Sequence, residues 1–218
     1  MNLSSQVIKE YVTQINQTST GVTPYKNGVE NADKLALGMI TEREVKDVIQ
    51  PFLYLWGWMY RVLERSEYSG WQRELAKMIG SNASVLEEFR TKELTADDPS
   101  QFRSEIKHCY DSFETVVGPI AAAKTLHLLC PSFLPPWDRK IARAAKTERS
   151  NGNDEDTKTE KLSGSDYFQF IVQVKNFIHT HDSLVSQLSS LYGKSKVKIA
   201  DECFWWATQR PLFVLMSS

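Results

Sequence analysis

The amino-acid sequence predicts an all-α fold. Three observations lead to this prediction. Apolar residues recur at the three- and four-residue spacing of amphipathic helices, and capping patterns such as Thr41-Glu42-Arg43-Glu44 precede two of these runs. The alternation typical of a half-buried strand is not sustained anywhere in the 218 residues. We therefore expect helices joined by turns, with a core of ordinary size for a chain of this length.

The first third of the chain is expected to form two helices separated by a loop. Residues 3–19 place apolar side chains on one side of a helix. Residues 20–31 contain Gly21, Pro24, Asn27 and Gly28 and are predicted to be a loop. The capping box at Thr41 begins the second helix, which extends to about residue 63, and Pro51 is expected to kink or break it.

Three helices are expected before the centre of the chain. Residues 70–79 form the first, which ends at Gly80. The pattern Ser84-Val85-Leu86-Glu87 is a second capping box. Asp98-Pro99 places proline at the first position of the third helix, which continues to about Thr115.

Residues 113–145 form the stretch around which the remaining sequence is organised. Gly118-Pro119 is a tight break that opens a helix over residues 120–130, which are rich in Ala and Leu. Three prolines then impose an irregular segment, because proline has no N–H and restricts the residue before it. This segment leads to Trp137 and Asp138, and a short helix follows over residues 139–145. Aspartate is a favourable N-cap, so the simplest role of Asp138 is to cap that helix.

The last third of the chain is expected to begin with a mobile surface loop. Nine of the twenty residues 146–165 are charged, and Leu162 is the only sizeable apolar one. Ser165 is expected to cap a long helix to about residue 192, with a break near His181, and Gly193 ends it. Residues 196–210 are predicted to form the last helix.

The composition is typical of a soluble globular protein, with 41% hydrophobic and 24% charged residues. No apolar run is long enough to span a membrane, and the first ten residues do not resemble a signal peptide. The three cysteines are too widely spaced for a metal motif or a disulfide framework, which favours the reducing cytoplasm. We expect no cofactor and no metal site, and the sequence leaves the oligomeric state open.

The net charge of −1 argues mildly against nucleic-acid binding, but local clustering of positive charge matters more. Two basic clusters are present, and each is interpreted either as a solvated helix face or as a contact for nucleic acid. Their members are Arg139, Lys140, Arg143 and Lys146 in one, and Lys194, Lys196 and Lys198 in the other.

Gly118 and Asp138 lie twenty residues apart, within the pattern V-G-P-x-x-A followed by P-x-x-D. This stretch of about thirty residues resembles the helix-hairpin-helix DNA glycosylase superfamily. In that family a hairpin ending in glycine binds a DNA phosphate, and a proline-containing turn presents the catalytic aspartate. The resemblance implies two helical lobes, with residues 41–130 as the central lobe that ends in the hairpin. Residues 1–40 and 131–218 would form the second lobe.

The chain departs from the family pattern at three points. The first glycine of the family hairpin is Val116 here. The position of the lysine that lyase members use is Ile120. The four closely spaced cysteines that hold an iron–sulfur cluster in some members are absent.

The resemblance, read residue by residue, implies a site. Asp138 would be the catalytic carboxylate, which stabilises an oxocarbenium-like sugar as the base leaves. Alternatively it is only a helix cap. The DNA-binding candidates are Val117, Gly118, Ile120, Arg139 and Lys140.

An enzyme that removes a base must hold it between aromatic or apolar side chains. Candidates for such a pocket are Trp58, Lys124, His127, Trp137 and Trp205, with Trp206 as the alternative to Trp205. An aromatic run at helical spacing more often belongs to the core than to a pocket. Asp201 and Glu202 could also face the cleft that the resemblance implies between the two lobes, but we expect them to form a surface charge pair with Lys198.

The function that these residues favour is a monofunctional DNA glycosylase, which flips a modified or damaged base and hydrolyses its N-glycosidic bond. Its partner would be double-stranded DNA, in repair or in bacterial defence against phage DNA with modified bases. The alternatives are a non-catalytic helical module that binds DNA or a protein, and a helical scaffold in which the spacing of Gly118 and Asp138 is accidental.

Overall fold

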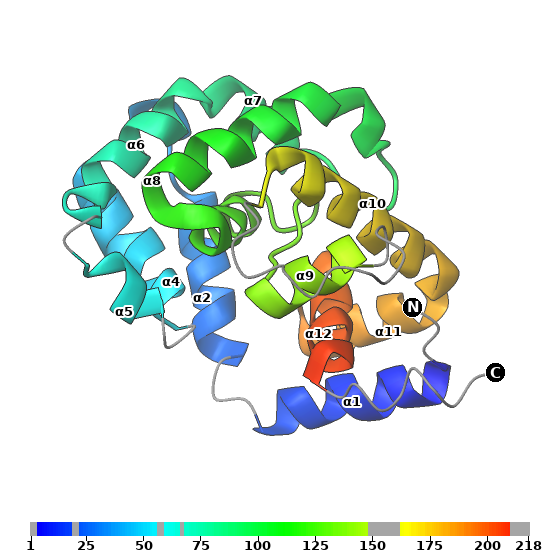
Figure 1. Ribbon diagram of the computed structural model, residues 1–218. Helices are drawn as coiled ribbons and strands as arrows, with labels where there is room; N and C mark the ends of the chain where they lie inside the picture. Colours follow the sequence, from blue (N-terminus) through cyan, green and yellow to red (C-terminus); the bar gives the residue numbers. More distant parts are fainter. Residues whose placement is uncertain (1–3, 19–21, 56–58, 66–67, 148–161, 210–218) are drawn as a thin grey trace.

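The computed structural model describes residues 4–18, 22–55, 59–65, 68–147 and 162–209, and every regular element in them is helical (Figure 1). The all-α class is therefore confirmed. Among these residues no helix has both the length and the apolar character needed to cross a membrane. The predicted mobile loop falls largely on residues 148–161, which lie outside the described residues, as does Trp58.

The N-terminal part of the fold contains α1 (Ser5–Thr18) and α2 (Val22–Asp33). The prediction of a loop over 20–31 was wrong. Pro24 lies in the first turn of α2, where no N–H is needed, and Gly28 packs so closely on Phe52 that a Cβ would lie 2.7 Å from its ring. Helix α1 packs against the C-terminal helices, whereas α2 packs against the middle of the chain.

The next helices follow closely on one another. After the 3₁₀ turn η1 (Leu37–Met39), the predicted capping box at Thr41 opens α3 (Glu42–Glu44), and both of its hydrogen bonds are present. A π-helical turn, η2 (Val45–Ile49), leads directly into α4 (Gln50–Tyr54), so the backbone stays helical at Pro51 and only the regular α-helical pattern is interrupted just before it. Helix α5 is Met59–Leu63 and α6 is Trp71–Ser81. Helix α7 (Ala83–Arg90) begins without a side-chain cap, so the predicted box at Ser84 was wrong.

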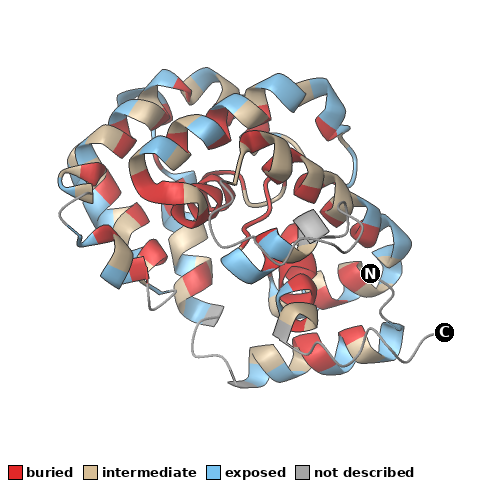
Figure 2. Cartoon of the chain, viewed as in Figure 1, coloured by how far each residue is buried: buried red, intermediate tan, exposed pale blue. Residues whose placement is uncertain are grey.

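Helix α8 (Arg103–Leu129) forms the centre of the molecule. It follows the 3₁₀ turn η4 (Pro99–Phe102), which Asp98 caps as expected. Helix α8 contacts α2, α4, α6, α7 and α10. Every residue from Ile120 to Cys130 is buried, which Figure 2 shows as the red stretch inside the fold. A helix that is buried on all sides is mostly apolar or small, as the alanines and leucines of this half of α8 are, although Lys124, Thr125 and His127 are buried in it as well.

The C-terminal helices complete the fold. They are α9 (Arg139–Thr147), α10 (Gly164–Thr180), α11 (Asp182–Tyr192) and α12 (Lys196–Gln209). The long predicted helix begins with a capping box at Ser163, two residues before the expected one, and is interrupted at His181 as expected. Gly193 ends α11 in the left-handed conformation. Helix α9 packs against α10 and α12 in front of the core (Figure 1).

Helix α8 is bent at Gly118, whose backbone has φ 76° and ψ 166° (Figure 1). Only glycine adopts this region readily, because a Cβ would clash with the backbone. Pro119 follows, at the first position of the second half of α8, where its missing N–H costs nothing. The predicted break at Gly118-Pro119 is thus present, and it separates an outer half of α8 from its buried inner half.

We expect Gly118→Ala to destabilise the protein by about 1–3 kcal/mol, the usual cost of holding a non-glycine residue in this region. The new Cβ would also lie 3.1 Å from the Tyr68 hydroxyl. Urea denaturation checks this, with Gly80→Ala as the control. Gly80 is helical and its Cβ would make only an ordinary van der Waals contact, 3.9 Å from the Leu37 carbonyl oxygen, so that variant should be as stable as the wild type or more stable by about 1 kcal/mol. Equal stability of the two variants would contradict the proposed constraint at Gly118.

Candidate functional site

The break at Gly118-Pro119 and the turn before Asp138 meet at one carbonyl oxygen. The Pro119 carbonyl accepts a hydrogen bond from the Tyr110 hydroxyl at 3.2 Å and another from the Trp137 indole N–H at 3.4 Å. Trp137 is 1% exposed and makes edge contacts with the rings of Tyr110 and Tyr167. The residue next to Gly118 and the residue next to Asp138 are therefore in direct contact.

The segment between α8 and α9 is irregular and almost entirely buried from Phe133 to Trp137. Buried backbone carbonyls need donors, and the prolines prevent regular pairing. Side chains supply these donors: the Tyr167 hydroxyl donates to the Pro135 carbonyl at 2.8 Å, and His127 Nδ1 donates to the Leu134 carbonyl at 2.8 Å. The turn is thus held from two neighbouring helices.

Asp138 ends this turn and caps α9, as the sequence predicts. Its Oδ1 accepts the Ile141 N–H at 2.9 Å, and its carbonyl accepts the Ala142 N–H at 2.9 Å. No other described residue hydrogen-bonds its second oxygen, Oδ2, and the residue is only half-buried. One carboxylate oxygen is therefore fixed by the helix cap, and the other has no hydrogen-bond partner among the described residues.

Lys124 lies on the inner half of α8 and is 2% exposed. Burial lowers the pKa of Lys124 from 10.5 to about 7. The negative charges of Asp201 and Asp138 oppose this decrease, whereas the positive charge of Lys198 adds to it. Near neutral pH this amine is therefore partly unprotonated and able to take up a proton. Lys124 therefore interacts electrostatically with Asp138 and also with Lys198 and Asp201 of α12.

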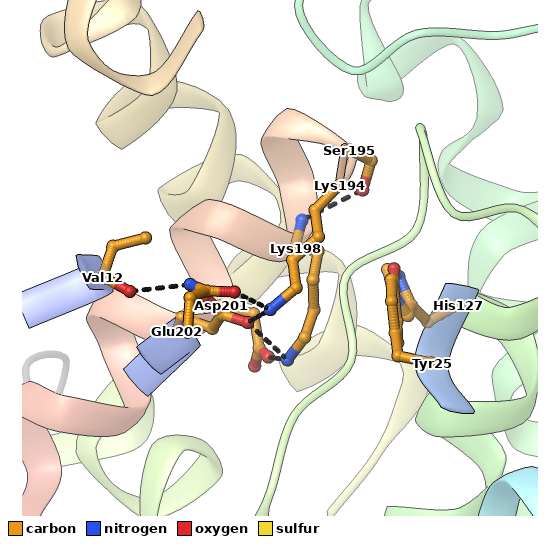
Figure 3. Close-up of polar contacts among 9 residues, drawn as sticks. Val12, Tyr25, His127, Lys194, Ser195, Lys198, Asp201 and Glu202 are labelled. Atoms are coloured by element: carbon orange, nitrogen blue, oxygen red, sulfur yellow. Dashed lines mark hydrogen bonds and ion pairs between the residues drawn. The ribbon is translucent and has the colours of Figure 1, made fainter. Parts of the chain in front are cut away.

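Those charged groups form a buried network around the start of α12 (Figure 3). Lys198 Nζ lies 2.5 Å from Asp201 Oδ2, and Lys194 Nζ lies 2.5 Å from Glu202 Oε1. The expected pairing of Asp201 with Lys198 is confirmed, but its expected location on the surface was wrong, because all four side chains are buried. Burial disfavours the charge of Lys198, but the two carboxylates outweigh it and raise its pKa.

Asn16 completes this network from α1. It accepts from Lys194 Nζ at 2.6 Å and donates to Glu202 Oε2 at 3.2 Å and to the Val12 carbonyl at 2.7 Å. The network therefore connects α1 with α12. Buried ion pairs of this kind are costly to break, since removing one partner leaves an unpaired charge in the interior.

Tyr25 of α2 lies between the network and His127 (Figure 3). The ammonium groups of Lys194 and Lys198 lie 6.0 and 5.8 Å from the centre of its ring, within the range of a cation–π interaction. The Tyr25 ring stacks on the His127 ring, and its hydroxyl lies 2.7 Å from His127 Nε2. Burial lowers the pKa of His127 to about 3, so its ring is neutral at ordinary pH.

The residues that the sequence indicated are distributed over several environments. Lys124, His127 and Trp137 are buried around the turn that presents Asp138, and the DNA-binding candidates Val117, Gly118 and Ile120 are buried as well. Arg139 and Lys140 are exposed at the start of α9, and Trp205 is 41% exposed on α12. Trp206 packs on Tyr11.

Sequence reasoning missed Tyr25 and Tyr167. The sequence predicts a loop at Tyr25, and Tyr167 follows a helix cap with no feature that indicates a role in a site. Among the described residues no group of three or more His, Cys, Asp or Glu side chains could hold a metal ion, and the three cysteines are free and buried.

No family model, curated protein or solved structure matches this chain.

We expect the stability of the fold to fall in acid because of His127. The neutral ring in the folded protein has a pKa of about 3, below the 6.5 of a solvated imidazole. The unfolded chain therefore binds the extra proton first, and stability is lost as the pH falls from 6.5 towards 3, by at most about 1.4 kcal/mol per pH unit. His127→Asn should remove this dependence in urea denaturation across that range. The control His108→Gln, which replaces an exposed histidine of α8, should retain it.

Proposed function

We propose that this protein is a monofunctional DNA glycosylase, which flips a modified or damaged base out of a duplex and hydrolyses its N-glycosidic bond. The observation that carries this proposal is the hydrogen bond from Trp137 to the Pro119 carbonyl. It brings the glycine-dependent break next to a turn that ends in a carboxylate. The two ends of the motif seen in the sequence thus lie close together, which supports a single site.

Asp138 has the properties that this chemistry needs. A departing base leaves positive charge on the sugar, and a fixed carboxylate beside the sugar stabilises that charge. The cap bond to Ile141 holds Oδ1, so Oδ2 has a defined direction without a partner among the described residues. Water would be the nucleophile, and an abasic site would be the product.

The surface beside Asp138 is suited to DNA. Arg139, Lys140 and Arg143 are exposed on α9, the helix that Asp138 opens. Phosphate contacts from such side chains position a duplex without reading its sequence. Val117, Gly118 and Ile120 are all buried, so a phosphate could contact the backbone at the break only if the Tyr68 hydroxyl, which lies over Gly118, moved aside. A role in repair and a role in defence against phage DNA with modified bases both fit this site.

A non-catalytic DNA-binding or protein-interaction module is the second candidate. It is favoured by the cap bond of Asp138, which explains this residue without catalysis, and by Val116 in place of the first hairpin glycine. Release of a base from modified duplexes separates the two candidates.

We expect Asp138→Asn to abolish base release from a panel of modified duplexes, measured as alkali-labile abasic sites. Asparagine is also a good N-cap, so the helix start, the stability and DNA binding should be retained. Asp98→Asn is the matched control, because Asp98 caps η4 in the same way, with Oδ1 accepting the Ser100 N–H at 3.0 Å. An Asp138→Asn variant with full activity would remove this residue from the mechanism.

We also expect no covalent enzyme–DNA intermediate. A lyase mechanism needs an amine that attacks the sugar, but the family position is Ile120 and the Lys124 side chain is 2% exposed. Borohydride added during turnover should therefore trap no adduct on a denaturing gel. An adduct that disappears in Lys124→Ala would overturn this prediction and assign Lys124 as the nucleophile.

A further inference from the structure

His127 is fully buried and makes one hydrogen bond with each ring nitrogen. Nδ1 lies 2.8 Å from the Leu134 carbonyl oxygen and Nε2 lies 2.7 Å from the Tyr25 hydroxyl. These partners come from different parts of the chain, since Leu134 belongs to the turn before Asp138 and Tyr25 to α2. Figure 3 shows the Tyr25 and His127 rings side by side.

The partners fix the tautomer of His127. A carbonyl oxygen only accepts, so Nδ1 carries the hydrogen and donates it to Leu134. Nε2 is then an acceptor, and the Tyr25 hydroxyl donates to it. Burial raises the pKa of Tyr25, which keeps this donor protonated. The chain of donors runs in one direction, from Tyr25 through His127 to the turn.

The Leu134 carbonyl lies four residues before Asp138, and the connection between them is stiff. Pro135 and Pro136 have fixed φ angles, the Tyr167 hydroxyl holds the Pro135 carbonyl, and Trp137 is packed under the break. A shift of Leu134 is therefore passed along the turn rather than absorbed in it. A leucine at position 127 could fill the same space but would leave the Leu134 carbonyl without this donor.

We propose that His127 is a positioning residue, which fixes the carboxylate of Asp138 by holding the Leu134 carbonyl in the single orientation set by Tyr25. This proposal rests on the proposed function for its catalytic consequence. Its structural consequence, the pose of Asp138, is independent of any activity.

Two substitutions separate the two bonds of His127. The side-chain N–H₂ of His127→Asn can take the place of Nδ1 and donate to Leu134, but it does not reach Tyr25. The amide of His127→Gln can take the place of Nε2 and contact Tyr25, but it leaves Leu134 without a donor. Both variants remove the ring, so both should lose a similar amount of stability if His127 has only a structural role.

The first measurement does not need activity. The amide of Ile141 is hydrogen-bonded to Asp138 Oδ1 and therefore reports the pose of the carboxylate. Its hydrogen-exchange protection should be retained in His127→Asn and reduced in His127→Gln, relative to amides of α6 in the same sample. Equal protection of Ile141 in the two variants would overturn the proposal.

The second measurement uses the duplex on which the wild type is most active. Single-turnover base release should fall about 100-fold in His127→Gln, as expected for a misplaced catalytic group, and remain within about threefold of the wild type in His127→Asn. The Kd for a duplex with a tetrahydrofuran abasic-site analogue should be unchanged in both. Equal rates in the two variants would overturn the catalytic consequence.

Two further outcomes are distinguishable. If the wild type releases no base from any duplex, the proposed function fails, while Ile141 exchange still decides whether His127 sets the pose of Asp138. If His127→Gln does not fold, Tyr25→Phe takes its place in both measurements, because it removes the hydroxyl that donates to His127 Nε2 and orients the ring. It should then reduce Ile141 protection and the rate together, and unchanged values would overturn the proposal.

Discussion

The carbonyl oxygen of Pro119 accepts hydrogen bonds from Tyr110 and Trp137, and the arrangement around it depends on the backbone of Gly118. Because φ is positive at Gly118, α8 changes direction there, and its second half enters the core surrounded by other helices. That buried half carries Lys124 and His127. The same bend allows Trp137 to lie beneath the break, so the chain returns to it after the proline turn and places Asp138 close by.

Burying charged side chains costs folding free energy, and nearby groups of opposite charge offset much of that cost. Burying three lysines requires carboxylates near them, which Asp201 and Glu202 provide for Lys198 and Lys194. Lys124 instead has a pKa near neutrality, because burial outweighs the attraction of Asp201 and Asp138. Helices α1, α2, α8 and α12 all contribute to this region, which therefore fixes their relative positions as well as the charges around Asp138.

Much of the fold could be predicted from local patterns, because local physics determines them. The capping box at Thr41, the cap at Asp98, the break at Gly118, the cap at Asp138 and the stop at Gly193 each depend on a few neighbouring residues. The incorrect predictions concern residues whose environment depends on parts of the chain that are distant in the sequence. Gly28 indicates a turn in the sequence, but in the fold it lies in a helix that packs closely on Phe52. The pair of Lys198 with Asp201 is predicted to be solvated, but other helices bury it. The role of Tyr25 could not be predicted, because its partner is about a hundred residues away in the sequence.

The central claim is that Gly118 and Asp138 form one site on DNA. The most direct test is a crystal structure of the protein bound to a duplex that contains a tetrahydrofuran abasic-site analogue. The account predicts a phosphate against the backbone at Gly118, α9 along the DNA backbone, and the Oδ2 atom of Asp138 facing the anomeric position of the extruded sugar. A duplex bound on another face, or a sugar held away from Asp138, would contradict it.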